Sequence, residues 1–300
     1  MNSGGSSPRH FGAVMSAMVT PFDAQGRLDL DAARRLARWL VERGNDGLVV
    51  AATTGEASTL SDAERCDLVR AVCEAVTVPV LAGTGSNDTA HTVALTRQAK
   101  ALGAAGVLLV GPYYNRPPQA GIEAHFRAAA AATDLPVMLY DVPLRTGRRV
   151  AHEVLLRLFR EVPNIVAFKD ATADPLAAAT LIAEVGEHFD LYSGDDAMTL
   201  PLLAVGAVGV VGTSTHWTSP QFAQMTAAFH EGRVQEARAI NARLLESFAF
   251  VNSDESVFPM SIKAMLRSLG QEVGDCRLPL VPAPPGVRAR AREVWDRLNH

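Results

Sequence analysis

Apolar and polar positions alternate along most of the chain on a regular scale. Short runs rich in Val, Leu and Ala are followed by longer segments in which apolar residues recur with a helical period. The short runs predict strands and the longer segments predict helices. The expected strands are residues 13–19, 47–52, 78–82, 106–110, 136–140, 165–169, 190–193 and 207–211.

Two helix starts are marked by their own residues. Ser61 precedes an apolar-periodic segment and Glu64 follows three positions later, which is the pattern of a capping box. Asp174 is followed by Pro175, and proline favours the first helical position. These signals place helices directly after the expected second and sixth strands.

The repeat of strand and helix predicts the fold. Eight units of roughly 25–30 residues match a (β/α)8 TIM barrel. An open doubly wound sheet has the same alternation, but no Gly-rich dinucleotide fingerprint follows the first strand. After Gly232 only helical patterns continue, which predicts a C-terminal helical extension. We therefore expect a flexible tail at 1–10, a catalytic barrel at 11–232 and a helical domain at 233–300.

Composition narrows the class of protein. The 300 residues are 48% hydrophobic and carry a formal net charge of −4, and no Lys/Arg cluster is interleaved with aromatics, so we expect no nucleic-acid partner. No apolar run approaches the roughly 20 residues that span a bilayer, so we expect no membrane partner. Three cysteines, Cys66, Cys73 and Cys276, favour reduced thiols and a cytoplasmic location.

Barrel enzymes carry their chemistry in the loops at the carboxyl ends of the strands. The polar residues expected there comprise one amine, one arginine and several hydroxyl and carboxylate groups. They are Thr53, Thr54 and Glu56 after the second strand, Tyr113, Tyr114 and Asn115 after the fourth, Tyr140 and Arg145 at the fifth, Lys169 at the sixth, Ser193, Gly194, Asp195 and Asp196 at the seventh, and Thr213 and Ser214 after the eighth.

Metal and phosphate chemistry receive little support from the sequence. The eight histidines are scattered and show no ligand spacing, so we expect no metal and no cofactor. The Gly-rich segment 208–216 could hold a phosphate, or its glycines could serve close backbone packing. We expect Asp195 and Asp196 to cap the helix that follows the seventh strand.

Lys169 is the principal candidate for catalysis. The chain has only three lysines, and this one ends the apolar run Ile165–Phe168. An ordinary lysine has a pKa of about 10.4, so only ~0.04% of its amine is neutral at pH 7. Burial lowers that pKa and yields an amine able to form a Schiff base with a ketone. The alternatives are a lysine that extends to the barrel rim or that pairs with Asp170.

Other residues add to this interpretation. Tyr140 ends the preceding strand, so its hydroxyl could deliver protons beside Lys169, although it could also simply fill the barrel interior. Thr53 and Thr54 could bind a small carboxylate or cap a turn. Arg145 could bind a second carboxylate in bidentate fashion or be a solvated loop charge.

Seven motifs, spread in order over residues 18–198, carry a family resemblance. They are MVTPF, TTGEASTL, AGTGSNDT, GPYYNRPPQAGIEAHF, LYDVPLRTG, IVAFKDAT and YSGDDAM. Together they resemble the dihydrodipicolinate synthase / N-acetylneuraminate lyase family of class I pyruvate aldolases. The resemblance covers the whole barrel and continues more weakly to the C-terminus.

The resemblance implies roles for individual residues. Lys169 matches the lysine that forms the Schiff base with pyruvate, and Tyr140 matches the tyrosine beside it. Thr53 matches the threonine that links this tyrosine to another one, matched by Tyr114, which the adjacent subunit donates. Thr54 matches the residue that holds the pyruvate carboxylate. The resemblance also implies a homotetramer built as a dimer of dimers.

The second substrate follows from the loop residues. Gly194 and Val211 are expected beside the bound ketoacid, and Arg145 matches the arginine that binds the carboxylate of aspartate semialdehyde. The implied reaction is the condensation of pyruvate with aspartate semialdehyde in lysine biosynthesis. The alternatives are an aldolase or dehydratase for 2-keto-3-deoxy sugar acids that uses the same imine, and a barrel that binds a ketoacid without turnover.

Several positions depart from the family pattern. Ala52 replaces a usual glycine, Asp141 a common asparagine, and the segments GTSTHWTSP and ESVFPMSIK are unusual. Lysine-inhibited members carry two histidines at the positions of Asp62 and Arg65 and a glutamate at that of His91. We therefore expect weak inhibition by lysine or none.

Overall fold

Eight parallel strands close into a barrel in the computed structural model, which describes residues 10–186, 189–251, 253 and 256–299. Each strand pairs with its neighbours in sequence, and β1 also pairs with β8. The strands are β1 (Val14–Ala17), β2 (Gly47–Val50), β3 (Val80–Gly83), β4 (Gly106–Val110), β5 (Val137–Asp141), β6 (Ile165–Asp170), β7 (Asp190–Ser193) and β8 (Gly209–Gly212). This confirms the predicted barrel, with strand ends within a few residues of those expected.

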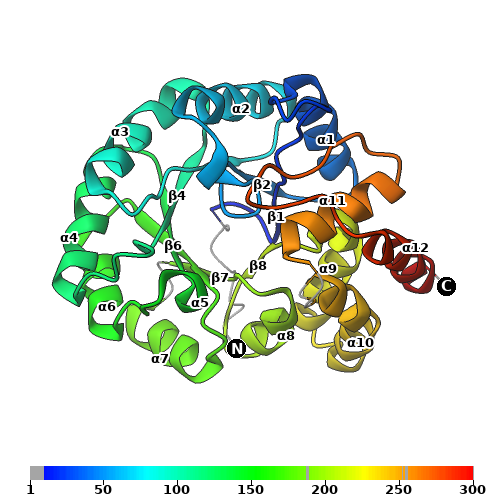
Figure 1. Cartoon of the computed structure of the whole chain (residues 1–300). Helices are drawn as coiled ribbons and strands as arrows, with labels where there is room; N and C mark the ends of the chain where they lie inside the picture. Colours follow the sequence, from blue (N-terminus) through cyan, green and yellow to red (C-terminus); the bar gives the residue numbers. More distant parts are fainter. Residues whose placement is uncertain (1–9, 187–188, 252, 254–255, 300) are drawn as a thin grey trace.

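Helices form an outer ring around the strands (Figure 1). They are α1 (Leu30–Glu42), α2 (Asp62–Ala75), α3 (Thr89–Ala99), α4 (Gln119–Ala130), α5 (Pro143–Thr146), α6 (His152–Glu161), α7 (Pro175–Val185), α8 (Thr199–Ala204) and α9 (Thr215–His230). Single 3-10 turns are η1 (Ala57–Thr59), η2 (Lys100–Leu102) and η3 (Asp196–Met198). Both predicted helix starts are confirmed, because Ser61 and Glu64 form the capping box and the Asp174 side chain accepts from the Ala177 N–H.

The C-terminal helices are α10 (Val234–Val251), α11 (Phe258–Ser268) and α12 (Pro285–Asn299). They lie together on one side of the barrel beside α9 (Figure 1). The predicted boundary at residue 232 falls between α9 and α10, where Gly232 has a φ of 78°. Residues 1–9 of the predicted tail lie outside the described residues, and the division into domains stays a prediction.

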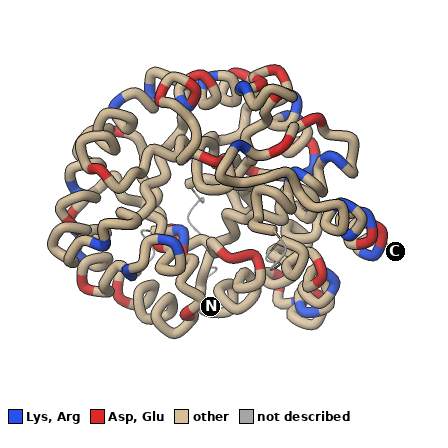
Figure 2. Tube along the Cα trace, viewed as in Figure 1, with Lys and Arg blue, Asp and Glu red and all other residues tan. Residues whose placement is uncertain are grey.

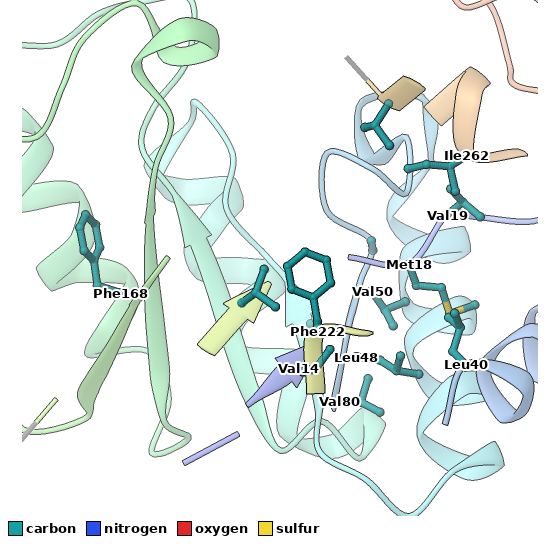
Figure 3. Close-up of a cluster of buried hydrophobic side chains, with 14 of the residues drawn as sticks. Val14, Met18, Val19, Leu40, Leu48, Val50, Val80, Phe168, Phe222 and Ile262 are labelled. Atoms are coloured by element: carbon teal, nitrogen blue, oxygen red, sulfur yellow. The ribbon is translucent and has the colours of Figure 1, made fainter. Parts of the chain in front are cut away.

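Apolar residues form two layers because side chains alternate across each strand. The inner layer fills the barrel and includes Met15, Leu108, Met138 and Tyr192. The outer layer packs between strands and helices, and Figure 3 shows part of it. Charged residues of both signs lie mainly around the outer ring (Figure 2). A charged side chain inside the barrel is therefore exceptional in this molecule.

Candidate active site

Lys169 points into the barrel near the carboxyl end of β6. It is 4% exposed and is paired in register with Tyr140 of β5 and Tyr192 of β7. Its Nζ atom lies 4.4 Å from the centre of the Tyr140 ring. The prediction that Tyr140 and Lys169 lie side by side on adjacent strands is thus confirmed.

The surroundings of Lys169 raise the neutral fraction of its amine. Within the described residues, Lys169 Nζ has no hydrogen bond and no carboxylate at ion-pair distance. Burial lowers the pKa of Lys169 to about 8, opposed by the charge of Asp196 and assisted by that of Arg145. At that value about a tenth of the amine is neutral at pH 7.

The suggested pair between Lys169 and Asp170 does not form. Successive side chains of a strand point to opposite faces, so Asp170 lies on the outer face of the barrel. Its Oδ1 accepts a hydrogen bond of 2.8 Å from the Thr172 N–H. The lysine does not extend to solvent either, since it is almost fully buried.

Tyr140 remains a proton donor at neutral pH. It is 7% exposed, and burial raises its pKa to about 12. A group that keeps its proton can act as a general acid toward an intermediate beside Lys169. Tyr140 also lines a cavity at the barrel mouth, so it is more than interior filling.

This cavity has a volume of about 250 Å³. Three of the predicted site residues, Thr53, Tyr140 and Arg145, line it together with Arg65 and Tyr113. The remaining lining residues are Ala51, Ala52, Ala57, Ser58, Gly83, Gly85, Leu108, Val110, Val142 and Thr146. Its size suits small molecules of a few carbon atoms rather than a sugar polymer.

The other predicted site residues, Lys169 among them, lie outside the lining of this cavity. Thr54 is buried next to Thr53. Gly194 packs against Lys169, because a Cβ at Gly194 would lie 3.0 Å from Lys169 Cγ. Val211 is part of the inner layer. Of these three residues, Gly194 is the one with a close contact to Lys169.

Tyr114 points away from the cavity of its own chain. It is 89% exposed and has a φ of 73°, which is uncommon for a bulky residue. Its neighbour Tyr113 lines the cavity instead. The single chain therefore does not bring Tyr114 to Lys169.

Arg145 lies in α5 at the rim, exposed to solvent on one side. Its Cζ atom lies 4.4 Å from the centre of the Phe258 ring, the first residue of α11. The structure is compatible with both interpretations of Arg145, as a solvated loop charge and as a carboxylate-binding residue, because the side chain is exposed and also lines the cavity. The contact brings the C-terminal extension to the edge of the site.

Asp196 has a different role from the one predicted. Asp195 caps η3 by accepting from the Ala197 N–H, as expected. The buried Asp196 instead accepts from the Thr213 N–H at 2.9 Å and the Ser214 N–H at 2.6 Å. The backbone donors that a phosphate would need are already occupied, and a Cβ at Gly212 would lie 2.5 Å from Asp196 Oδ1. Glycine serves close packing here.

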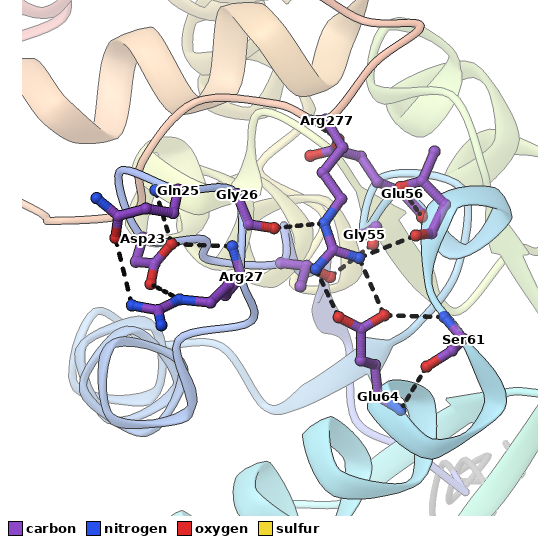
Figure 4. Close-up of polar contacts among 11 residues, drawn as sticks. Asp23, Gln25, Gly26, Arg27, Gly55, Glu56, Ser61, Glu64 and Arg277 are labelled. Carbon is purple, nitrogen blue, oxygen red and sulfur yellow. Dashed lines mark hydrogen bonds and ion pairs between the residues drawn. The ribbon is translucent and has the colours of Figure 1, made fainter.

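A buried ion pair joins the loop after β2 to α11. Lys263 Nζ donates to Glu56 Oε1 at 2.7 Å, and both side chains are 2% exposed. Glu56 Oε2 accepts from the Arg277 N–H at 2.8 Å, and the Arg277 guanidinium binds Glu64 (Figure 4). Glu56 follows Thr53 and Thr54 by two to three positions. Sequence reasoning missed this pair, because its members are 207 positions apart.

Backbone strain gathers on the same side of the barrel. Within the described ranges, the non-glycine residues with positive φ are Ala51, Glu56, Tyr114, Arg116 and Ala173. They lie in the loops that follow β2, β4 and β6. Such conformations cluster at functional sites, so they support the placement of the site at the carboxyl ends of the strands.

The described residues show neither a metal-binding cluster nor a membrane-spanning helix. In that part of the chain, no group of three or more His, Cys, Asp or Glu side chains could hold a metal ion. No described helix is long and apolar enough to cross a membrane. The cysteines Cys66, Cys73 and Cys276 are all unpaired.

Fold and site together define a class: a lyase of the class I aldolase type, with an amine inside a (β/α)8 barrel. A family model described as the dihydrodipicolinate synthetase family matches residues 10–294. The chain belongs to this family.

Relatives and solved structures agree over nearly the full length. The chain is 50% identical over 288 residues to a 4-hydroxy-tetrahydrodipicolinate synthase of Acidothermus cellulolyticus, covering 95% of this chain and 92% of the relative. A dihydrodipicolinate synthase structure from Bacillus anthracis has a TM-score of 0.92 at 40% identity, covering 95% and 98% of the two chains. The lysine-bound structure of the Cyanidioschyzon merolae protein has a TM-score of 0.93 at 41% identity, covering 97% and 99%.

Proposed function

We propose that the protein condenses pyruvate with L-aspartate 4-semialdehyde to give 4-hydroxy-tetrahydrodipicolinate, in the diaminopimelate route to lysine. The observation that carries this proposal is the buried Lys169 amine, which lies 4.4 Å from the centre of the Tyr140 ring and has no ion-pair partner among the described residues. The names of relatives at 47–50% identity support the choice of substrates.

The reaction begins at Lys169. Neutral Nζ attacks C2 of pyruvate, and the carbinolamine loses one water to give an imine. Loss of a proton from the methyl carbon gives an enamine, which attacks the aldehyde carbon of the semialdehyde. The amino group of the condensed product then displaces Lys169 from the imine carbon, which closes a six-membered ring and frees the amine. The imine itself accepts the electrons, so no cofactor is required.

Tyr140 supplies and accepts the protons of these steps. We assign Thr53 and Tyr114 to a relay that connects the Tyr140 hydroxyl to solvent. Because Tyr114 is exposed and lies outside the cavity of its own chain, it would have to come from a second subunit. A homotetramer arranged as a dimer of dimers, acting in the cytoplasm, is part of this proposal.

Substrate carboxylates are assigned to two places. Thr54 holds the pyruvate carboxylate, with Gly194 and the backbone near Val211 beside the ketoacid. Arg145 binds the carboxylate of the semialdehyde from the cavity rim. A polyol chain would need hydroxyl-binding groups instead of this arginine, so Arg145 favours the semialdehyde over a 2-keto-3-deoxy sugar acid.

Borohydride trapping tests the role of Lys169, and trapping combined with a kinetic assay tests the role of Arg145. Treatment with pyruvate and borohydride, followed by peptide mass mapping, should modify residue 169, and the trapping rate should rise with pH up to about 8 as Lys169 loses its proton. Arg145→Ala should leave trapping nearly unchanged but lower kcat/KM for the semialdehyde roughly 10²-fold in a coupled reductase assay.

The possible results separate the candidate functions. An unmodified Lys169 would remove the imine from the mechanism. Equal losses of trapping and condensation in Arg145→Ala would contradict the role assigned to Arg145. Trapping by wild-type protein without any turnover of the semialdehyde would favour a sugar-acid aldolase or a ketoacid-binding barrel.

A further inference from the structure

A second cavity lies on the outer face of the barrel, behind the candidate active site. It has a volume of about 460 Å³ and is lined by residues of β5, β6, α6 and α7. The helices α6 and α7 are neighbours in the outer ring (Figure 1), and β5 pairs with β6. Asp141 and Asp170 line it, and each follows directly after Tyr140 or Lys169. Because side chains alternate across a strand, the two carboxylates face this cavity while Tyr140 and Lys169 face the barrel interior.

The two carboxylates are paired in register and almost fully buried. Asp141 is 1% exposed and Asp170 is 3% exposed. Asp141 Oδ2 accepts from the Val150 N–H at 3.1 Å, and Asp170 Oδ1 accepts from the Thr172 N–H at 2.8 Å. Asp141 Oδ1 has no hydrogen-bond partner in the described part of the chain. A buried carboxylate oxygen without a donor is costly, and it calls for a ligand that can donate.

The basic side chains around the cavity lie against other carboxylates. Arg149 donates to Asp174 at 2.8 Å, and His152 lies 3.3 Å from Glu184. The remaining charged lining residue, Glu153 of α6, is itself acidic. The lining residues from α7 are all apolar. The cavity is therefore acidic, and burial together with the nearby Asp170 raises the pKa of Asp141 to about 7.

The rest of the lining is largely hydrocarbon. Val150, Leu155, Phe168 and Leu181 contribute apolar surface next to the carboxylates. A divalent metal ion could complete its coordination shell with water, but it would leave the apolar wall and most of the volume without contact. A ligand with one positive charge and a short aliphatic chain would contact both the carboxylates and the apolar wall of the cavity.

We propose that this outer cavity binds a small organic cation, a primary ammonium group on a short aliphatic chain. The ammonium group lies between the carboxylates of Asp141 and Asp170 and donates to Asp141 Oδ1. The aliphatic chain packs against Phe168, Leu155 and Leu181. The site is separate from the proposed pyruvate site, because the β5 and β6 backbones lie between them.

Calorimetric titration with n-butylammonium chloride tests the proposal on the full chain. The wild-type protein should show saturable binding that strengthens roughly tenfold between pH 6 and pH 8, because Asp141 becomes charged through about pH 7 while the alkylamine stays protonated. Asp141→Asn keeps the shape of the side chain and should weaken binding at least about tenfold. Glu153→Gln, on the same cavity, is the matched control and should change the affinity less than twofold.

Several outcomes would overturn the proposal. They are an absence of saturable binding, equal binding of neutral n-butanol, or an Asp141→Asn variant that binds as well as the wild type. Potassium chloride at the same concentration tests the contribution of the aliphatic chain. Equal binding heats from potassium would show that the chain contributes nothing, which would also overturn the proposal. Should Asp141→Asn fail to fold, Asp170→Asn measured in the same way provides the same test.

Discussion

Two lysines of this protein are buried beside aromatic rings. Within the described residues, one of them forms an ion pair and the other does not. Lys169 of β6 is 4% exposed and Lys263 of α11 is 2% exposed, and each amine lies over an aromatic ring, at 4.4 Å and 4.3 Å. Lys263 donates to Glu56 and to the Asp275 carbonyl oxygen. Lys169 has no such partner among the described residues.

The difference shows that burial alone does not make an amine nucleophilic. The ion pair of Lys263 with Glu56 ties α11 to the loop after β2. Lys169 has no ion-pair partner among the described residues, and desolvation outweighs the opposing charge of Asp196, so its pKa falls to about 8. We therefore interpret the Lys263 region as structural support and the Lys169 region as reactive, which four changes can test.

Methionine at position 169 should have the largest effect. Lys169→Met removes the nucleophile, so kcat should fall roughly 10⁴–10⁶-fold. Stability should be unchanged or higher, because a desolvated amine without a partner is replaced by an apolar chain of similar length. Steady-state kinetics and thermal unfolding measure the two effects. A marked drop in Tm would show that Lys169 has a stabilising partner.

Phenylalanine at position 140 should have the next largest effect. Tyr140→Phe keeps the ring over the amine and removes only the proton donor, so the rate should fall roughly 10²–10⁴-fold. Borohydride trapping at long incubation should still modify Lys169, because the nucleophile is intact. A near-normal turnover rate would exclude Tyr140 as the general acid.

Replacing Lys263 with methionine should mainly lower the free energy of unfolding. Lys263→Met leaves Glu56 buried without its partner, which should cost about 3–5 kcal/mol of unfolding free energy. Chemical denaturation measures this loss. The double variant Lys263→Met with Glu56→Gln removes both charges and should recover part of it. If the single variant is as stable as the wild type, the ion pair does not provide the support inferred here.

Added lysine should have the smallest effect. His91 Nε2 lies 2.8 Å from Asp62 Oδ1, and the buried Arg65 donates to the Ala57 carbonyl oxygen, so a cationic inhibitor would meet an engaged carboxylate and an added positive charge. Condensation should change less than about twofold at sub-millimolar lysine. The Cyanidioschyzon merolae relative, whose structure contains lysine, serves as a comparison. Half-maximal inhibition in that range would contradict this expectation.

The barrel could be predicted because its signals are local. Strand and helix periods, the capping box of Ser61 and Glu64, and the proline after Asp174 each depend on residues a few positions apart. The contact of Tyr140 with Lys169 was also predictable, since consecutive strands of a barrel are neighbours. Apolar alternation therefore carries most of the information on the fold and on the centre of the site.

Long-range polar contacts could not be predicted in this way. Glu56 and Lys263 are brought together only by the packing of α11 on the loop after β2. Asp196 resembled a helix cap, but the end of β8 offers it two backbone donors. The orientation of Tyr114 depends on a left-handed backbone that no local pattern indicates. Each of these features is decided by segments far apart in the chain.

The alternation at the ends of β5 and β6 limits how this protein can change. A single residue deleted upstream in β6 would turn the amine toward the surrounding helices and bring an acid into the barrel. Substitutions can change the barrel interior or the outer cavity separately. Insertions and deletions within a strand would exchange the side chains that face the two sides. Variation among descendants should therefore accumulate as substitutions in these two strands, with length changes confined to the connecting loops.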